Sequence, residues 1–519
     1  MNFKTIVQGF GAAIVLLILR VWPQLSSYHP VIYHSFLPMP SVIWGILIDL
    51  GVVSLLAALL FRYLEKTDTG LRTVVWAFVA AQLGSALVIA GAAMRRAPIP
   101  HLSPNTAYII ILLAALILRG LRPLVYRRAV RGFGVLLTLA GCSMVWMIPE
   151  LLYLGLRAQR TDAQVPVTYP VLASSPSDPP GGGGRIVWLL FDELSYDQTF
   201  DHRFPGLAMP AFDSFKRNSV SFSDLKPAGY YTDRVIPAFF LGAPVDNIRS
   251  NLDGDAMVRL AGNGQWKAFD AHATLFADAQ RLGWTTGVVG WYNPYCRILA
   301  GTLNYCFWRM GDGQSDGAMP DHSALQNAVA PIVETGRGLK HEPGFAHERL
   351  EQDLTAIMPQ AEALIRDQTI GFVFIHLPVP HPPGIYDRRL GRQRATGSYI
   401  DNLALADKSL AELMGVLGST PLAQKTTVIV CSDHSWRVPM WRSTAVWTKE
   451  DEAASHGRFD PRPVLMIHFP GQESEKAVTA PFDAIRIHEI IEHMLRGEEP
   501  GFDKALLAGG GGSPVARKP

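Results

Sequence analysis

Residues 185–193 read RIVWLLFDE, an apolar and β-branched run that stops at two acidic residues. Such a run is typical of a strand that is buried on both faces, as in a parallel sheet. Similar runs lie at 286–291, 370–376, 426–431 and 463–469. Amphipathic stretches that predict helices alternate with them, at 211–218, 273–282, 348–367, 397–416 and 484–496. This alternation predicts an α/β domain over residues 185–500, with a mainly parallel central sheet and helices on both faces.

Three of these runs lead into acids or histidines. The first leads into Asp192 and Glu193, the run at 370–376 ends at His376 with His381 after it, and the run at 426–431 leads through a serine into Asp433 and His434. Ligands of parallel α/β sheets bind beyond the carboxyl ends of the strands. Carboxylate oxygens and imidazole nitrogens are ligands that Zn²⁺ and Mn²⁺ accept. One carboxylate after a strand is as often a helix cap, but the groups together predict a metal site.

The first 157 residues differ in composition from the rest, because Leu, Val, Ile and Ala dominate them. About 20 apolar residues cross a bilayer as a helix. Five stretches approach or reach that length, at 5–22, 42–63, 73–94, 104–119 and 133–156. We therefore expect a transmembrane domain of five helices over residues 1–157. The first stretch, after Lys4, is alternatively a secretory signal peptide, but no small-residue cleavage site follows it closely.

Basic residues in the connecting segments orient this block. Lys and Arg gather after the second and fourth stretches, at Arg62, Lys66, Arg72, Arg119, Arg122, Arg127, Arg128 and Arg131. The segment 23–41 has none, and only Arg95 and Arg96 follow the third stretch. Because basic loops stay on the cytoplasmic side, we expect a multi-pass protein of the cell (inner) membrane with a cytoplasmic N-terminus. Five crossings then place the α/β domain on the periplasmic or extracellular side.

Two charged residues lie within the apolar stretches. Arg20 is near the end of the first stretch, and Asp49 lies about a third of the way into the second. Unpaired charge within a bilayer is costly. We therefore expect these side chains to pair with each other, to snorkel toward the surface, or to face a polar cavity on a substrate path.

Low-complexity segments flank the α/β domain. Residues 158–184 include LASSPSDPPGGGG and predict a flexible linker, while residues 501–519 predict a disordered tail. The formal net charge of +2 gives no indication of a nucleic-acid partner. Of the four cysteines, Cys296 and Cys306 share one segment and are the candidate disulfide pair. An oxidising side of the membrane would favour that bond, and two free thiols are the alternative.

Several segments, read in chain order after IVWLLFDE, resemble the motifs of the sulfatase-like branch of the alkaline phosphatase superfamily. They are MPAFDSFKRNSVSFSD, PAGYYTDRVIPAFFLG, TLFADAQRLGWTTGVVG, FVFIHLPVPHPPGIYD, YIDNLALADKSLAELMGVL and VIVCSDHS. The resemblance covers nearly all of residues 185–495 and implies that family's α/β fold. One departure is SDHS, where the family has SDHG.

The resemblance places the nucleophile at Thr232. True sulfatases have a Cys or Ser there that matures to formylglycine, and no cysteine lies near this position. Arginine is the second residue after Thr232 and not the fourth, as it is in the sulfatase motif. A threonine nucleophile is similar to that of lipoteichoic acid synthases and of phosphoethanolamine or phosphoglycerol transferases. Those enzymes also tend to have five N-terminal spans and an extracytoplasmic catalytic domain.

The resemblance also implies a metal and a reaction. The ion would be Zn²⁺ or Mn²⁺, with Ca²⁺ or Mg²⁺ as alternatives, held by Asp192, Thr232, Asp433 and His434. Glu193 is either a further ligand or a supporting residue. We expect phosphoryl-group transfer from a membrane lipid donor to an envelope glycan or lipid acceptor, through a phospho-threonine intermediate. The alternatives are a hydrolase with the same core (a phosphodiesterase or a sulfuric ester hydrolase) and a catalytically silent scaffold.

Two histidines complete the expected site. His381 matches the histidine of the family's PH-x-PY stretch, where it would bind the phosphoryl group or protonate the leaving oxygen. His456 precedes RPVLMIHFPG, where the family often has a second histidine that contacts substrate. His376 ends a predicted strand and is expected to be structural. Asp233 and Arg234, beside the nucleophile, are expected to form a surface ion pair; the alternative is that Arg234 holds a substrate oxygen.

Overall fold

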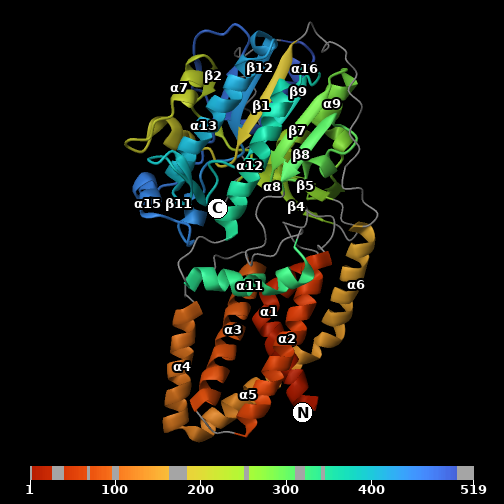
Figure 1. Cartoon of the computed structure of the whole chain (residues 1–519), viewed down its shortest axis with the longest axis vertical. Helices are drawn as coiled ribbons and strands as arrows, with labels where there is room; N and C mark the ends of the chain where they lie inside the picture. The colour runs from red at the N-terminus through yellow and green to blue at the C-terminus, as the bar shows by residue number, and fades with distance from the viewer. Residues whose placement is uncertain are drawn as a thin grey trace. The chain divides into compact units, whose positions relative to one another are not determined.

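The computed structural model describes residues 3–25, 40–66, 70–95, 104–162, 184–250, 256–262, 264–309, 322–339 and 345–498 (Figure 1). The chain divides into two compact units. The helical unit contains the described residues up to 162 together with residues 322–333, and the sheet unit contains the rest. Most of the predicted linker and all of the predicted tail lie outside the described residues.

The helical unit begins with six helices. They are α1 (Phe3–Leu25), α2 (Pro40–Glu65), α3 (Gly70–Arg95), α4 (Pro104–Leu121), α5 (Pro123–Cys142) and α6 (Met144–Asp162). In the described residues, two helical stretches are long and apolar enough to cross a membrane, Pro40–Glu65 and the nearly continuous Pro123–Arg157. The other apolar stretches are shorter, Phe3–Ile18, Gly70–Gly84, Tyr108–Leu121 and Ala324–Val333. The predicted block of five spans is therefore not confirmed.

The fifth predicted span, 133–156, is divided between α5 and α6. The break falls at Ser143, whose hydroxyl donates to Ala140 O at 2.7 Å, a back-bond that bends helices. Upstream of the break, α5 packs closely on α1. A Cβ added to Gly11 would lie 1.9 Å from Leu137 O, and one added to Gly141 would lie 2.0 Å from Val7 O. Glycine at both positions is therefore what lets the two backbones approach.

The two charges predicted within the apolar stretches meet. Arg20 Nη1 donates to Asp49 Oδ2, and Arg20 Nη2 donates to Asn327 O at 2.9 Å. Asn327 belongs to α11 (Ala324–Leu339), which follows the sheet unit's strand β8 in sequence. The expected pairing of Arg20 with Asp49 is confirmed. The sequence analysis assigned residues 322–333 to the α/β domain, whereas the structure groups them with the helical unit.

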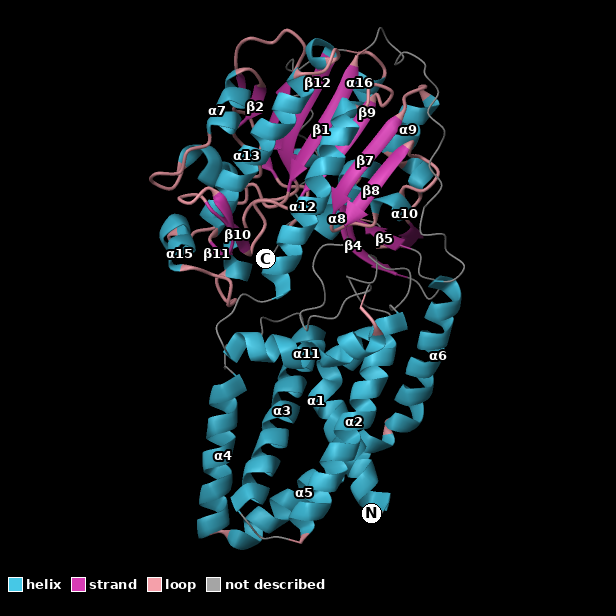
Figure 2. Ribbon diagram, viewed as in Figure 1, coloured by secondary structure: helices cyan, strands magenta, loops and turns pink. Residues whose placement is uncertain are grey.

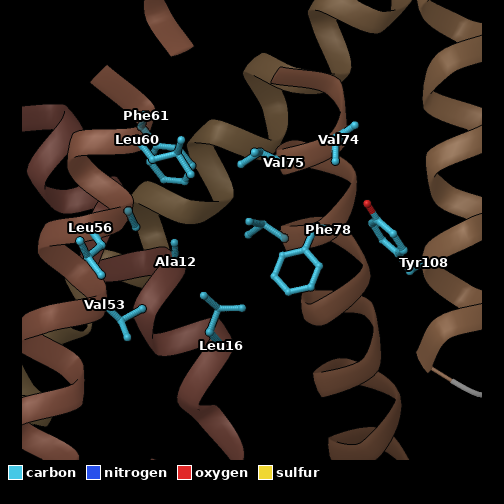
Figure 3. A pocket seen from close by; sticks show the side chains of 12 residues that line it. Ala12, Leu16, Val53, Leu56, Leu60, Phe61, Val74, Val75, Phe78 and Tyr108 are labelled. Atoms are coloured by element: carbon cyan, nitrogen blue, oxygen red, sulfur yellow. The ribbon is translucent and has the colours of Figure 1, made fainter. Parts of the chain in front are cut away.

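Large apolar side chains of the helical unit point outward. On α2 they occur at positions one, three or four residues apart, Ile48, Val52, Leu55, Leu56, Leu59, Leu60 and Tyr63. Four of the helices also enclose an apolar cavity of about 510 Å³ (Figure 3). Its lining side chains come from α1 to α4 and include Leu16, Val53, Phe78 and Tyr108.

The sheet unit is built on one sheet of eight strands in the order β14-β2-β13-β12-β1-β9-β7-β8 (Figure 2). Their bounds are β1 (Arg185–Phe191), β2 (Val220–Phe222), β7 (Thr286–Trp291), β8 (Tyr305–Arg309), β9 (Phe372–Leu377), β12 (Thr426–Ser432), β13 (Leu465–His468) and β14 (Lys476–Val478). Every neighbouring pair is parallel except the two pairs made by β13. The predicted α/β architecture with a mainly parallel sheet is confirmed.

Helices cover both faces of this sheet. Alternate residues of β1 point to opposite sides, with Trp188 in one core cluster and Leu189 in the other, as the period of a strand requires. The first cluster includes α8 (Thr232–Leu241), α9 (Leu275–Arg281) and α16 (Ile487–Leu495). The second includes α7 (Pro210–Arg217), α12 (Phe345–Arg366) and α13 (Tyr399–Gly418). All of β1 is buried, which explains why its sequence is continuously apolar.

Smaller elements complete the sheet unit. The short helices are α10 (Tyr295–Ile298), α14 (Val438–Trp441) and α15 (Lys449–Ser455). Three small sheets pair β4 (Val245–Ser250), β5 (Ala256–Leu260) and β6 (Trp266–Ala268); β10 (Gly384–Asp387) and β11 (Arg392–Gly397); and β3 (Leu225–Lys226) and β15 (Phe482–Asp483).

Candidate active site

The strand register brings the predicted ligands to one edge of the sheet. Phe191, the last residue of β1, pairs with Ser432 of β12 on one side and with Leu377 of β9 on the other. Asp192 and Asp433 are the next residues after two of these neighbouring strand ends, and both are fully buried. The carboxyl ends of adjacent parallel strands thus place two carboxylates next to each other.

Thr232 and His434 join the two carboxylates. Thr232 Oγ1 lies 3.3 Å from Asp192 Oδ2 and 3.2 Å from His434 Nε2, and His434 Nε2 lies 3.1 Å from Asp433 Oδ2. His434 Nδ1 lies 3.1 Å from Ser435 O. A carbonyl only accepts, so Nδ1 carries the proton and Nε2 presents its lone pair. Burial lowers the pKa of His434 to about 3, which keeps the ring neutral.

These four residues form a cluster rich in acceptors. The Thr232 hydroxyl has a single proton for two acceptor neighbours, Asp192 and His434. Asp433 Oδ2 accepts no hydrogen bond from any residue that the structure describes. Buried carboxylates are normally compensated by a donor or a cation. The oxygen and nitrogen donor set fits a divalent cation, and Asp192, Asp433, His434 and Thr232 are the residues that would hold it.

Glu193 lies at the same strand end but has partners of its own. It adopts a left-handed backbone conformation with φ +63°, which non-glycine residues rarely take. Its Oε1 accepts from Arg437 Nε at 2.6 Å and also from Arg437 Nη2, and both of its oxygens lie 2.9 Å from Trp441 Nε1. Burial opposes the charge, yet Arg437 with His381 and His434 lowers the pKa of Glu193.

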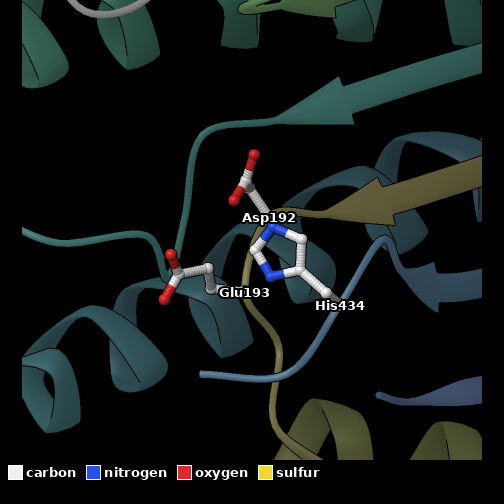
Figure 4. Close-up of side chains that lie close together, drawn as sticks. All are labelled: Asp192, Glu193 and His434. Carbon is white, nitrogen blue, oxygen red and sulfur yellow. The ribbon is translucent and has the colours of Figure 1, made fainter. Parts of the chain in front are cut away.

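The geometry also allows Glu193 to be a metal ligand. One potential ligand atom each from Asp192, Glu193 and His434 lie within 4.8 Å of one another. Figure 4 shows the three side chains gathered where β1 ends. Because the guanidinium of Arg437 neutralises the Glu193 carboxylate, we regard Asp433 as the better match to the acceptor-rich cluster.

A chain of hydrogen bonds leads from Asn293 through Tyr295 and His376 to Asp192. Asn293 Nδ2 donates to Tyr295 OH at 3.3 Å, and Tyr295 OH lies 2.7 Å from His376 Nδ1. His376 Nε2 lies 3.3 Å from Asp192 Oδ2. Burial lowers the pKa of His376 to about 4, so the ring is neutral. If Tyr295 donates to Nδ1, the Nε2 proton of His376 points at Asp192, which orients that carboxylate.

His381 is held between two indole rings. Its ring centroid is 5.1 Å from Trp291 and 5.1 Å from Trp441. Arg437 Nη2 lies 3.3 Å from His381 Nε2. A guanidinium only donates, so Nε2 accepts and a neutral His381 carries its proton on Nδ1. That Nδ1 has no hydrogen-bond partner among the described residues.

Thr232 is the first residue of α8, where backbone N–H groups favour an anion. The helix ends at Gly242, which has φ +63° and where an added Cβ would lie 2.7 Å from the ring of His488. Asp233 Oδ1 and Arg234 Nε lie 3.9 Å apart and form the expected ion pair, but the acid of this pair is buried and not at the surface. Asp233 is only 6% exposed, and burial raises its pKa to about 6.

Comparison with known proteins agrees with this geometry. The profile of the sulfatase family matches residues 185–494. The chain belongs to the sulfatase family. It is a sulfatase-like enzyme.

Three solved structures illustrate the similarity. The PsFucS1 sulfatase from Pseudoalteromonas sp. is 14% identical over 61% of this chain and 68% of its own, with a TM-score of 0.43. The phosphonate monoester hydrolase of Agrobacterium radiobacter is 14% identical over 64% and 79%, with a TM-score of 0.39. A Vibrio parahaemolyticus protein of the alkaline phosphatase superfamily is 15% identical over 64% and 71%, with a TM-score of 0.37. No curated protein sequence matches the chain.

Other predicted residues of this sulfatase-family chain lie away from the cluster. His456 is exposed at the end of α15, with φ +48°, and no described contact joins its side chain to Thr232. Its role as a substrate contact stays a prediction. Cys296 and Cys306 form the predicted disulfide. Trp291 and Tyr295 precede Cys296 in the chain and pack beside His381 and His376, respectively.

Sequence reasoning missed Arg437 and Trp441, the partners of Glu193. Arg437 follows the SDHS motif by two residues, and it is only 5% exposed. The closeness of Arg437 to the SDHS motif is the feature of the sequence that could have identified it as a site residue. A buried arginine needs an anionic partner, and Glu193 was the acid that lacked an assigned role.

Proposed function

We propose that this protein is a membrane-bound, metal-dependent phosphoryl-group transferase that forms a phospho-threonine intermediate at Thr232. The carrying observation is the position of the Thr232 hydroxyl, 3.3 Å from Asp192 and 3.2 Å from His434, at the start of α8. A threonine cannot become formylglycine, so sulfatase chemistry through that group has no starting residue here. A hydroxyl nucleophile beside a cation-binding cluster suits phosphoryl transfer in two displacement steps.

The first step would form the intermediate. A bound divalent cation would lower the pKa of the Thr232 hydroxyl and neutralise charge on the phosphoryl oxygens. Thr232 Oγ1 forms a bond to phosphorus, and the bond from phosphorus to the donor's alkoxide oxygen breaks. The proton that Thr232 releases would pass through water to that leaving oxygen, and the Nδ1–H of His381 would donate a hydrogen bond to the same oxygen. The Glu193–Arg437 pair and the flanking indoles of Trp291 and Trp441 hold the His381 ring in place.

The second step would regenerate the enzyme. An acceptor hydroxyl attacks phosphorus, the bond from phosphorus to Thr232 Oγ1 breaks, and the acceptor's proton passes to Thr232 Oγ1, which restores the hydroxyl. Thr232 is only 5% exposed, which supports transfer because a shielded intermediate reacts less readily with water. The same core with water as the acceptor would be a hydrolase.

A lipid donor is the substrate class that we favour. The helical unit turns large apolar side chains outward on α2, and α1 to α4 enclose an apolar cavity of about 510 Å³. Both features suit contact with acyl chains. We propose that the helical unit is a multi-pass block of the cell (inner) membrane and that the sheet unit lies on the periplasmic or extracellular side. The acceptor would be an envelope glycan or lipid.

The test is to trap the intermediate. The full chain in lipid nanodiscs is incubated with phosphatidylethanolamine or phosphatidylglycerol, quenched in acid and digested. Mass spectrometry should find phosphoethanolamine or phosphoglycerol on the peptide that contains Thr232, and chelation beforehand should remove it. Thr232→Ser should retain the modified peptide, and Thr232→Ala should lose it. An unmodified Thr232 during turnover would overturn the proposal.

The products separate transfer from hydrolysis. Envelope lipids and glycans are compared with and without the gene, and the purified enzyme is given an alcohol acceptor. A phosphoethanolamine or phosphoglycerol substituent that disappears with the gene supports transfer. Release of the headgroup to water alone, with an ester that accumulates when the gene is absent, would establish the hydrolase instead.

A further inference from the structure

The helix α11 is attached to the helical unit although it lies between β8 and α12 in sequence. Its contact with α2 is close, because a Cβ added to Gly45 would lie 2.9 Å from Ala324 O and 3.0 Å from Asn327 Cβ. Asn327 Nδ2 donates to Ser41 Oγ at 3.2 Å, and Asn327 O accepts from Arg20. Small residues and one buried polar group therefore fasten α11 to α1 and α2.

The outer side of α11 is strongly apolar. Leu325 is 65% exposed, Val329 42%, Ile332 73% and Val333 49%. Their spacing of four, three and one residues places them on one helical face. The inward positions are instead small or polar, Asn327, Ala328 and Ala330. A helix at the surface of a soluble protein has the opposite arrangement, with its large apolar residues turned inward.

The helical unit also exposes apolar side chains on α2. On α2 the exposed apolar positions begin at Ile48, one turn after Gly45, and continue through Val52 and Leu55. Figure 1 shows α11 crosswise to α1 and α2. An amphipathic helix that lies in the plane of a bilayer has this crosswise setting, with its apolar face among the headgroups and the upper acyl chains.

We propose that α11 is an interfacial helix whose Leu325, Val329, Ile332 and Val333 side chains are immersed in the lipid bilayer. This inference rests on the membrane location proposed for the helical unit. Because α11 continues in sequence to β8 and α12, it would fasten an insertion of the catalytic sheet unit to the lipid surface. A second attachment of this kind limits how far that unit can drift from a lipid donor.

A spin-label measurement tests the immersion. The full chain carries Cys142→Ser, since Cys142 is exposed, and keeps the buried Cys431 and the disulfide. A nitroxide is attached at Ile332→Cys, at Leu55→Cys on α2, or at Leu282→Cys in the sheet unit, and the protein is reconstituted in phosphatidylcholine–phosphatidylglycerol vesicles. Relaxation is then measured with oxygen, which dissolves in lipid, and with a water-soluble nickel chelate. The Ile332 label should respond more to oxygen than to nickel, as the Leu55 label should, whereas the Leu282 label should show the reverse.

The outcomes separate this inference from the proposed membrane location. If the Ile332 label behaves like the Leu282 label while the Leu55 label senses lipid, the block is in the membrane and α11 is not. If neither agent reaches the Ile332 label, protein covers that face, and the inference is equally overturned. If the Leu55 label responds to nickel, the membrane location itself fails.

Undocking the helix provides a second test. Gly45→Leu places a side chain where only 2.9 Å separates the added Cβ from Ala324 O, whereas an atom added to Gly51 on the same helix meets nothing within 4 Å. Gly45→Leu should therefore shift the accessibility of the Ile332 label, and Gly51→Leu should leave it unchanged. Equal responses of the two variants would contradict the docked position of α11.

Discussion

The two units of this protein distribute apolar and polar side chains in opposite ways. In the helical unit, large apolar residues cover the exposed face of α2, while the ion pair of Arg20 and Asp49 lies inside. In the sheet unit, β1 is entirely buried, and the exposed large apolar residues among those described are Tyr231, Leu282, Leu390 and Met440. Burial follows the solvent, so the difference supports the proposal that lipid surrounds the helical unit and water the sheet unit.

Polar residues also have different tasks in the two units. In the sheet unit they gather at the carboxyl ends of β1 and β12, where Asp433 Oδ2 accepts no hydrogen bond from any described residue. Such a cluster costs stability and is retained for chemistry. In the helical unit the buried charges neutralise each other, which is what a low-dielectric surrounding demands.

The largest expected effect concerns the catalytic cluster. Thr232→Ala should lower kcat by roughly 10⁴-fold or more, since loss of a nucleophile removes a covalent step. The free energy of unfolding should change by less than about 1 kcal/mol. The hydroxyl has one proton for two acceptor neighbours, so its hydrogen bonds add little stability. Steady-state kinetics and thermal melts of the purified full chain measure both. Thr232→Ser is the matched control and should retain measurable activity; a silent Thr232→Ser would contradict a simple hydroxyl role.

The buried ion pair of the helical unit should show the next largest effect. Arg20→Leu should destabilise that unit by about 3–5 kcal/mol, because Asp49 is left as an uncompensated buried charge. The double variant Arg20→Leu/Asp49→Leu should recover most of the loss. Thermal unfolding in detergent micelles measures the change. A double variant as unstable as the single one would show that the pair is needed for its hydrogen bonds, such as the one to Asn327 O.

Matched surface substitutions sharpen the contrast between the units. Leu55→Lys, at a position 55% exposed in α2, should disfavour membrane insertion by about 3 kcal/mol. Leu282→Lys, at a position 37% exposed in the sheet unit, should alter stability by less than about 0.5 kcal/mol. A membrane-insertion assay and thermal melts compare the two variants. Equal tolerance of lysine at both positions would remove the argument that α2 faces lipid.

Helix capping should give the smallest effect. Ser398 caps α13 and forms a capping box with Asp401, in which Asp401 N donates to Ser398 Oγ at 3.1 Å. Ser398→Ala should cost about 1 kcal/mol of unfolding free energy in the sheet unit. Chemical denaturation followed by tryptophan fluorescence measures it. Ser419→Ala, at the other end of the same helix, is the control and should cost less.

Much of the sheet unit could be predicted from the sequence, since β1, β9 and β12 are continuous apolar runs. Strands β2 and β14 could not, because three residues are too few to show a period. β13 was found as a run, but its antiparallel direction depends on how the chain returns to the sheet. In the helical unit, the break at Ser143 lies in an unbroken apolar stretch, so hydropathy alone could not locate it.

In the candidate site, too, some residues could be predicted from the sequence and others could not. Asp192, Asp433 and His434 could be picked from sequence because each follows a strand end, and parallel strands bring such ends to one edge. The partners that hold them could not, since Tyr295 meets His376 across 81 positions of the chain. Likewise, only the fold decides that Arg437 neutralises Glu193. From the sequence by itself one could predict the acids and histidines at the strand ends and the division into an apolar and a more polar part. Tertiary structure alone decided which side chains face each other and that α11 joins the helical unit, because strand register and close backbone approach have no local signature.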